Sequence, residues 1–341
     1  MKAAALEQYT VQDILEYRGN STLFYSIDEN NSIENALALM YAHDIVSLPV
    51  FSTDSTHKFI DIVSVYDLRD YIMHAPELEK EVDFQLLSGR PSGKSTVLQD
   101  TIAQVVQSRK HASQEVSADM PLEELIRLFT TYKQHRVLVT NVPTQANVQK
   151  VPDIGRKRGD SIDSGCSAAS QSNSDTAVCG LTQYDVVRFI QHHNHQLGSL
   201  LDAPALAIAQ THPSLRQAAP KHMPHITVRD TALKALATLS STHASALPVV
   251  DYDGRLVTEI AGTSLRALTT RNIGLLGKPV LAFMFNLHMP VTRPYIIHEN
   301  FTLSQIMTGL LQMNCRRAWL VDRDDRPIAV ISLTDVLYHF L

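Results

Sequence analysis

The chain contains four copies of one short segment, and this repeat constrains the fold more than any single motif does. In each copy an apolar helical pattern leads into a β-rich segment. The spacing between the two is 13 residues in every copy, from Ala36 to Pro49, Leu125 to Leu138, Ala235 to Pro248, and Ile306 to Trp319. Such a repeat indicates tandem structural units that are each too small to bury their own apolar face and that therefore pack together.

Three of the copies also share a closing element, in which an aspartate follows a hydroxyl residue by three positions. The pairs are Ser64 with Asp67, Thr182 with Asp185, and Ser332 with Asp335. In the third copy the matching stretch runs from Thr263 to Arg266, so an arginine stands at the position of the acid. Each pair predicts the start of a helix, because a hydroxyl N-cap and an acid three positions later form a capping box.

Each copy predicts the element order β-α-β-β-α, which makes the fold class α+β with four tandem units. Ser32, and Thr302 with Gln305, are expected helix caps, and Asp253-Gly254 is a strong hairpin turn signal. We divide the chain into an N-terminal segment (1–20), unit 1 (21–75), a connector (76–112), unit 2 (113–195), a linker (196–222), unit 3 (223–272), a connector (273–290) and unit 4 (291–341).

Unit 2 is interrupted by a polar insertion. From Leu138 to Asp185 there are 47 residues, whereas the same interval in unit 1 is 18. Residues from about 141 to 177 are rich in Ser, Asn, Asp, Gly and Gln and fall where a hairpin turn belongs, so we expect a disordered loop. The basic run 156–158 precedes Ser161, which is a candidate phosphorylation site. The favoured alternative is a solubilising linker.

Composition limits the classes of function. The formal net charge of -5 supplies no global positive field for a nucleic acid or an anionic membrane. No stretch reaches the roughly 18 apolar residues that a membrane span needs. The cysteines Cys166, Cys179 and Cys315 are odd in number and lack metal-ligand spacing, which favours a reducing compartment. We therefore expect a cytoplasmic or nuclear protein, or one present in both, without nucleic acid or membrane as a partner.

A β-α-β-β-α unit with an LPV-type strand and a closing Ser/Thr-x-x-Asp element resembles the cystathionine β-synthase (CBS) domain. Four copies between about residues 20 and 341 resemble the γ regulatory subunit of the AMP-activated and sucrose-nonfermenting protein kinase family. The resemblance implies that units pair through their sheets into two Bateman modules, which assemble into a disk. It also implies AMP, ADP or ATP as regulatory ligands between paired units, and the catalytic and scaffold subunits of a protein kinase as partners.

The resemblance assigns candidate ligand contacts residue by residue. The ribose hydroxyls would be bound by Asp67, Asp185 and Asp335 together with the cap residues Ser64, Thr182 and Ser332, although helix capping alone also explains these residues. The phosphates would be bound by basic pairs before the central strand, His135-Arg136 in unit 2 and Arg316-Arg317 in unit 4. At the corresponding positions we place Ile45-Val46 in unit 1 and Ala244-Ser245 in unit 3, so basic donors come only from units 2 and 4. For a single basic pair, a solvated strand start is the alternative.

Other chemistry is weakly supported. The run His192-His193-Asn194-His195 lacks a nearby Cys or acidic ligand, so we interpret it as a solvated helix end and expect no metal site. Trp319 is expected to pack in the core. No phosphate-binding GxxxxGKS loop, HExxH or GxSxG sequence occurs, and we expect a non-enzyme. The alternative to a nucleotide-dependent regulator is a CBS scaffold that acts through protein contacts alone.

Overall fold

The repeat folds into four small sheets, each flanked by helices. The computed structural model describes residues 6–19, 25–54, 58–90, 97–109, 114–131, 135–142, 177–211, 223–289, 291 and 293–341. Within these residues every sheet has three strands, with the first strand parallel and the third antiparallel to the middle one. The predicted α+β fold of tandem β-α-β-β-α units is confirmed.

Units 1 and 2 have the following elements. Unit 1 comprises β1 (Ile27–Asp28), α2 (Ile33–Ala42), β2 (Ser47–Phe51), β3 (Phe59–Ser64) and α3 (Val65–Met73). Unit 2 comprises β4 (Glu115–Ser117), α6 (Leu122–Thr131), β5 (Arg136–Val142), β6 (Ala177–Thr182) and α7 (Gln183–His192). The insertion expected at 141–177 falls almost wholly in 143–176, and this segment and Ser161 lie outside the described residues.

Units 3 and 4 repeat the order with one change. Unit 3 comprises β7 (Ile226–Thr227), α9 (Ala232–Thr242), β8 (Ala246–Val250), β9 (Leu256–Ala261) and the 3-10 helix η6 (Gly262–Ala267). Unit 4 comprises β10 (Ile296–Ile297), α11 (Leu303–Gln312), β11 (Arg317–Val321), β12 (Pro327–Ser332) and α12 (Leu333–Tyr338). The last helix of unit 3 is short and 3-10, because it starts at a glycine and its cap position holds Ala261, which has no side-chain acceptor.

The predicted helix caps are confirmed. Ser32 accepts a hydrogen bond from the amide of Asn35, and Thr302 and Gln305 form a capping box. The three Ser/Thr-x-x-Asp elements form capping boxes at the starts of α3, α7 and α12. These caps place each aspartate at the corner between a strand and a helix.

Strand register corrects two of our sequence alignments. Ser47 pairs with Ser64 in unit 1 and Ala246 pairs with Ala261 in unit 3, intervals of 17 and 15 residues. The hairpin of unit 3 is thus two residues shorter, so Ser264, not Arg266, occupies the position of the acid. Counting residues along the chain gave the wrong alignment because the hairpin loops differ in length between units. Strand pairing, in contrast, fixes which residues correspond.

The same register moves the residues that correspond to the basic pairs. Arg136 pairs with Thr182 and Arg317 pairs with Ser332, so their counterparts are Ser47 in unit 1 and Ala246 in unit 3. The pairs aligned with His135-Arg136 are therefore Val46-Ser47 and Ser245-Ala246, one residue later than we assigned. None of these four residues is basic, so the basic pairs still come only from units 2 and 4.

The connecting segments contribute helices that cross between units. Four isolated β-bridges attach them, Thr10–Pro121, Ser32–Thr101, Pro204–Thr302 and Thr231–Pro279. Through these bridges α1 (Val11–Arg18) joins unit 2, α5 (Ile102–Ser108) joins unit 1, α8 (Ala205–Thr211) joins unit 4 and α10 (Val280–Asn286) joins unit 3. The remaining elements are α4 (Leu78–Ser88), η2 (Val97–Gln99), η3 (Asn194–Gln196), η4 (Gly198–Asp202) and η7 (Ile273–Gly277).

The two large apolar cores each join units from different modules. One core contains buried residues of units 1 and 3, including Leu37 and Leu236, and the other contains buried residues of units 2 and 4, including Phe129 and Leu337. We call these the 1/3 core and the 2/4 core. Because an apolar core contributes roughly 25 cal/mol per Å² of buried surface, the two halves of the chain stabilise each other.

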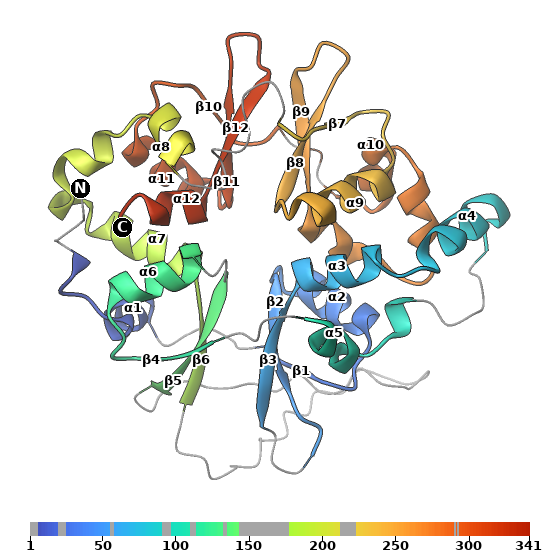
Figure 1. Cartoon of the computed structure of the whole chain (residues 1–341), viewed down its shortest axis with the longest axis horizontal. Coiled ribbons are helices and arrows are strands. Elements are labelled where there is room, and N and C mark those ends of the chain that lie inside the picture. Colours follow the sequence, from blue (N-terminus) through green and yellow to red (C-terminus); the bar gives the residue numbers. More distant parts are fainter. Residues whose placement is uncertain are drawn as a thin grey trace, which may run out of the picture.

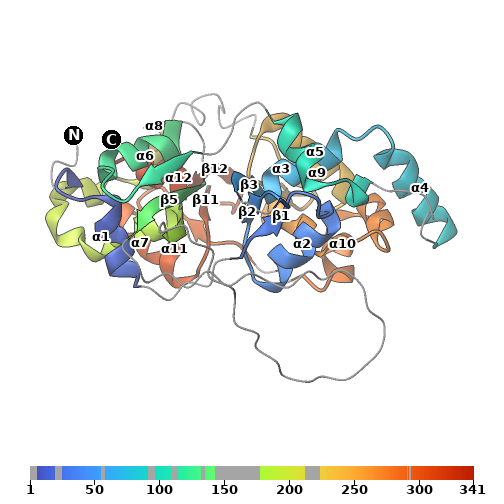
Figure 2. The same cartoon turned by 90° about the horizontal axis from the view of Figure 1, so that it is seen from below.

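Two modules arranged around a centre give the molecule a flat, disk-like shape (Figures 1 and 2). Figure 1 shows the strands along the middle, with α2, α3 and α9 on one side and α6, α7, α11 and α12 on the other. A small third cluster, which includes Ala261 and the fully buried Trp319, joins the sheets of units 3 and 4 and confirms the packing role expected for Trp319. Between units 1 and 2, Arg136 Nη1 donates to the carbonyl of Ser47 at 3.1 Å.

Candidate ligand site at the centre of the disk

The four units meet around a central cavity of about 370 Å³. Its position follows from the repeat, because residues just before the middle strands of all four units, and residues at the starts of α3, α7 and α12, line it. The lining residues are Asp44, Val46 and Tyr66 from unit 1, His135, Arg136, Thr182, Gln183 and Tyr184 from unit 2, Ser245 from unit 3, and Asn314, Arg316, Arg317, Ser332, Leu333 and Thr334 from unit 4. All four residues of the predicted basic pairs are thus brought into one cavity.

Two of the guanidinium groups are held in place by the protein. Arg317 is only 6% exposed and its Nη1 lies 2.6 Å from a carboxylate oxygen of Glu259 in unit 3. Burial opposes the charge of Arg317, but the Glu259 carboxylate outweighs it and raises the pKa of Arg317. For Arg136, burial lowers the pKa to about 10, so this group also stays charged at neutral pH.

The Nε atoms of both arginines, Arg136 and Arg317, are buried and have no hydrogen-bond partner in the described part of the chain. A buried donor without a partner costs about 1–3 kcal/mol, and a bound acceptor at this place would recover part of that cost. Oxyanions are the natural acceptors, because a guanidinium binds phosphate or carboxylate through two parallel hydrogen bonds.

The other two basic residues face the solvent of the cavity. The Arg316 side chain is exposed to the cavity, but protein lies around the cavity and removes much of the bulk water. This desolvation, together with the charges of Arg317 and Arg266, lowers the pKa of Arg316. No ion pair or hydrogen bond to its guanidinium occurs within the described residues. His135 is likewise exposed to the cavity, and desolvation by the surrounding protein lowers the pKa of its imidazole, whose Nδ1 lies 3.3 Å from Gln183 Oε1.

The candidate ribose acids lie around the cavity and serve as helix caps. Asp67 Oδ2 accepts the backbone amide of Ser64 at 2.7 Å, and Asp185 and Asp335 make the equivalent bonds to Thr182 and Ser332 at 2.9 and 2.7 Å. Of the six candidate ribose residues, only the hydroxyl residues Thr182 and Ser332 line the cavity.

Two arginines outside the four units, which the sequence analysis missed, approach these acids. Arg109, just after α5, places Nε 3.1 Å from Asp67 Oδ1 and Nη1 3.2 Å from Asp61 Oδ2. Arg18, at the end of α1, lies 3.7 Å from Asp185 Oδ2. The two arginines follow their bridge residues Thr10 and Thr101 by eight positions each, a spacing that could have identified them from the sequence.

A second pair of missed arginines joins units 1 and 3 symmetrically. Arg69 donates to the carbonyl of Ala244 at 2.8 Å, and Arg266 donates to the carbonyl of Ile45 at 3.1 Å. Each arginine follows its cap position by five residues, so the two contacts are related by the internal repeat. Arg266 therefore has a structural role between the modules, and Asp44 lies 2.8 Å from it.

The histidine run makes packing contacts. His193 lies against the rings of Tyr9 and Phe189, and its Nδ1 is 2.9 Å from the carbonyl of Phe189. Across the described ranges, no group of three or more His, Cys, Asp or Glu side chains is arranged to hold a metal ion. No helix among the same residues combines the length and apolar character needed to cross a membrane.

Comparison with known proteins identifies the class of this fold. The CBS domain family matches residues 21–74 and 287–341, which correspond to units 1 and 4. Units 1 and 4 therefore match the CBS domain, and units 2 and 3 share the strand topology of these two units. A comparison with curated protein sequences found no match.

Among solved structures, the four-unit arrangement is similar to that of a Methanocaldococcus jannaschii protein described as a candidate archaeal homologue of γ-AMPK. The identity is 15%, the TM-score is 0.65, and the match covers 98% of this chain and 100% of the other. An uncharacterised Pyrococcus horikoshii protein is 16% identical over 86% of this chain and 91% of its own, with a TM-score of 0.45. A structure of CBSX2 in complex with AMP is 24% identical over 34% of this chain and 85% of its own, with a TM-score of 0.28. The TM-score of 0.65 shows that the fold of this chain is similar to that of the Methanocaldococcus jannaschii protein.

Proposed function

We propose that the protein is a non-catalytic regulatory subunit that binds AMP, ADP or ATP at the centre of the disk and modulates a partner protein kinase. The observation that carries this proposal is the convergence of His135, Arg136, Arg316 and Arg317 in one cavity of about 370 Å³. Three of these are guanidinium groups in a chain whose net charge is -5, so the positive charge is concentrated where a polyanion would bind.

The cavity chemistry supports phosphate as the anchored group. Arg316 has no partner within the described residues, and the Nε atoms of Arg136 and Arg317 lack acceptors. The hydroxyl residues Thr182 and Ser332 line the same cavity, and in the proposal the ribose lies beside them, near Asp185 and Asp335. Ser64 and Asp67 would serve the corresponding site of unit 1.

Regulation requires that the nucleotide bind two states of the assembly with different affinity, since equal affinity shifts no equilibrium. The 2/4 core and the 1/3 core connect the modules, so a change at the centre reaches both halves. The kinase catalytic and scaffold subunits as partners, and a cytoplasmic or nuclear location, are proposed from the resemblance and the composition.

A second candidate function is a scaffold that acts without nucleotide. The ion pairs of Asp67 with Arg109 and of Asp185 with Arg18 favour it, because both acids already have a cationic partner. Unit 3 also has Ser264 in place of the acid. Nucleotide binding measured directly distinguishes the two functions.

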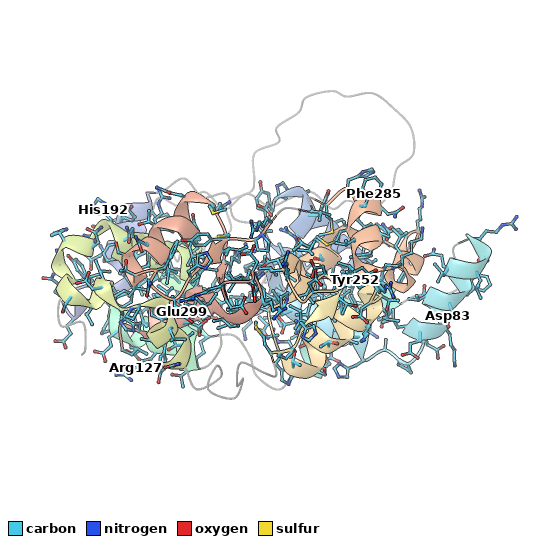
Figure 3. The ribbon with its side chains drawn as sticks, turned by 90° about the horizontal axis from the view of Figure 1, so that it is seen from above. Asp83, Arg127, His192, Tyr252, Phe285 and Glu299 are labelled. Atoms are coloured by element: carbon cyan, nitrogen blue, oxygen red, sulfur yellow. The ribbon has the colours of Figure 1, made fainter. Side chains whose placement is uncertain are left out.

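The test is isothermal titration calorimetry with AMP, ADP and ATP on the full chain and on Arg316→Gln. This variant removes a cavity charge that makes no ion pair or hydrogen bond within the described residues. A charge-assisted hydrogen bond contributes about 1.5–3 kcal/mol, so we expect binding to weaken about tenfold or more. The matched control is Arg127→Gln, which removes the same charge from an exposed side chain at the surface (Figure 3).

Two results would reject the regulatory proposal. One is the absence of binding heat and of thermal stabilisation with all three nucleotides in well-folded protein, which leaves the scaffold. The other is equal weakening in Arg316→Gln and Arg127→Gln, which would show an effect of net charge and not of the cavity.

A further inference from the structure

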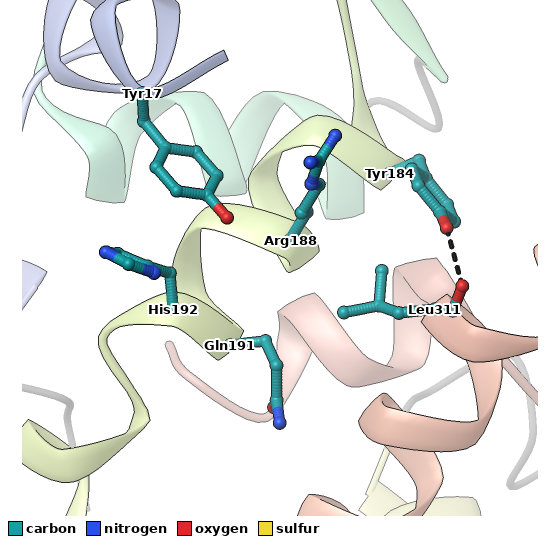
Figure 4. Close-up of a pocket in the computed structure, with 6 residues that line it drawn as sticks. All are labelled: Tyr17, Tyr184, Arg188, Gln191, His192 and Leu311. Carbon is teal, nitrogen blue, oxygen red and sulfur yellow. Dashed lines mark hydrogen bonds between the residues drawn. The ribbon is translucent and has the colours of Figure 1, made fainter.

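A second cavity, separate from the centre, lies where α1, α7 and α11 meet. Its volume is about 390 Å³, and its lining residues are Tyr17, Tyr184, Arg188, Gln191, His192 and Leu311. Figure 4 shows Tyr17, Arg188 and His192 around it, with Leu311 on the opposite side. The cavity lies between units 2 and 4, which belong to different modules. It shares only Tyr184 with the central cavity.

The lining of this cavity favours a negatively charged ligand. Arg188 and His192 are exposed and lie four residues apart on α7, and no acidic residue belongs to the lining. The Arg188 guanidinium lies 5.8 Å from the ring centroid of Tyr17, which positions it without neutralising it. Within the part of the chain that the structure describes, no carboxylate pairs with Arg188.

The walls of the cavity include the flat faces of two tyrosine rings and the apolar side chain of Leu311. Tyr17 also lies against His192, with ring centroids 4.7 Å apart and an interplanar angle of 34°. On the other side, Tyr184 donates its hydroxyl to the carbonyl of Leu311 at 3.0 Å, which fixes that wall (Figure 4). Tyr17 and Leu311 thus offer apolar surface for a planar group, with the Arg188 guanidinium in the same lining for an attached anion.

The internal repeat provides a comparison that separates function from folding. At the equivalent place between units 1 and 3, the repeat puts Asp70 at the position of Arg188 and Ser108 at the position of Tyr17. Asp70 is paired there with Arg69, at 2.7 Å. The same arrangement of helices forms between units 1 and 3 with Asp70 and Ser108 at these positions. Packing of the helices therefore does not require Arg188 or Tyr17.

We propose that this inter-module cavity binds a small organic oxyanion, a phosphate or carboxylate attached to a planar apolar group. The guanidinium of Arg188 would bind the oxyanion through paired hydrogen bonds, with His192 beside it. The volume lies within the range of roughly 300–1,000 Å³ that is usual for small-molecule sites. This site does not depend on nucleotide binding at the centre.

The test uses phenyl phosphate and benzoate as probes, so that binding of a phosphate is compared with binding of a carboxylate. Benzyl alcohol is the neutral control. Calorimetry on the full chain should show binding of at least one anion and none of benzyl alcohol. Arg188→Gln should weaken that binding about tenfold or more, because a charge-assisted bond is lost. The surface variant Arg127→Gln should leave it unchanged.

Three outcomes overturn the proposal. The first is that neither anion binds the folded protein. The second is that Arg316→Gln, and not Arg188→Gln, weakens binding, which would place the anion in the central cavity. The third is that benzyl alcohol binds as tightly as the anions, which would exclude recognition of charge. His192→Gln is a second variant that should also weaken binding if Arg188→Gln fails to fold.

Discussion

Replacing Glu259 with glutamine tests how the central arginines are held. Glu259 Oε1 lies 2.6 Å from Arg317 Nη1, and its Oε2 accepts the indole hydrogen of Trp319 at 2.5 Å. The side chains of Arg317 and Glu259 are 7% and 28% exposed. Glutamine retains the shape and an acceptor for Trp319 but removes the charge that balances Arg317.

The magnitude follows from the burial of the pair. Removing one partner of a buried ion pair costs about 3–5 kcal/mol, because the other charge stays buried. Glu259 is partly exposed and glutamine can still accept a hydrogen bond from Trp319, so we expect about 2–3 kcal/mol. With an unfolding entropy of about 2.1 cal/mol/K per residue, this lowers Tm by about 3–4 °C for a chain of 341 residues.

Urea unfolding and thermal melting of Glu259→Gln would measure this cost. The matched control is Glu123→Gln, which breaks the exposed pair with Arg127, where the side chains are 32% and 49% exposed. Exposed pairs contribute about 0–1 kcal/mol, so the control should be close to the wild type. Equal stability of the two variants would refute the argument that Glu259 anchors Arg317.

Three further predictions concern the connector helices, the cavity histidine and the shared cores. Arg109→Gln should destabilise the protein by about 2–4 kcal/mol in urea unfolding, because it removes a cationic partner of Asp61, which is 3% exposed. A decrease in the free energy of unfolding below about 0.5 kcal/mol would contradict this. Burial lowers the pKa of His135 from its ordinary 6.5, so the unfolded chain binds more protons and stability should fall as pH drops below about 6.5. His135→Gln should reduce that slope, and an unchanged slope would argue against desolvation of the imidazole by the surrounding protein. A protease site placed within 212–222 should leave the two halves associated in gel filtration after cleavage, because both apolar cores join them; separation into folded halves would show independent modules.

Local features were predictable because they depend on neighbours in the chain. The capping boxes at Ser64, Thr182 and Ser332 need only residues three positions apart, and all three form as expected. Alignment across the hairpin of unit 3 was wrong, since counting assigned Arg266 to a position that strand pairing gives to Ser264. Pairing depends on hydrogen bonds between strands, and loop length does not reveal it.

The tandem repeat by itself determined the α+β class, the order of elements in each unit and the two units that carry basic pairs, because the spacing of apolar and capping residues is written along the chain. Only the tertiary structure decided that His135, Arg136, Arg316 and Arg317 line one cavity, and that Arg18 and Arg109 reach the acids of units 2 and 1. It also decided that each large core joins two modules. These contacts link residues far apart in sequence, and they are selected by burying apolar faces that no single unit can cover alone.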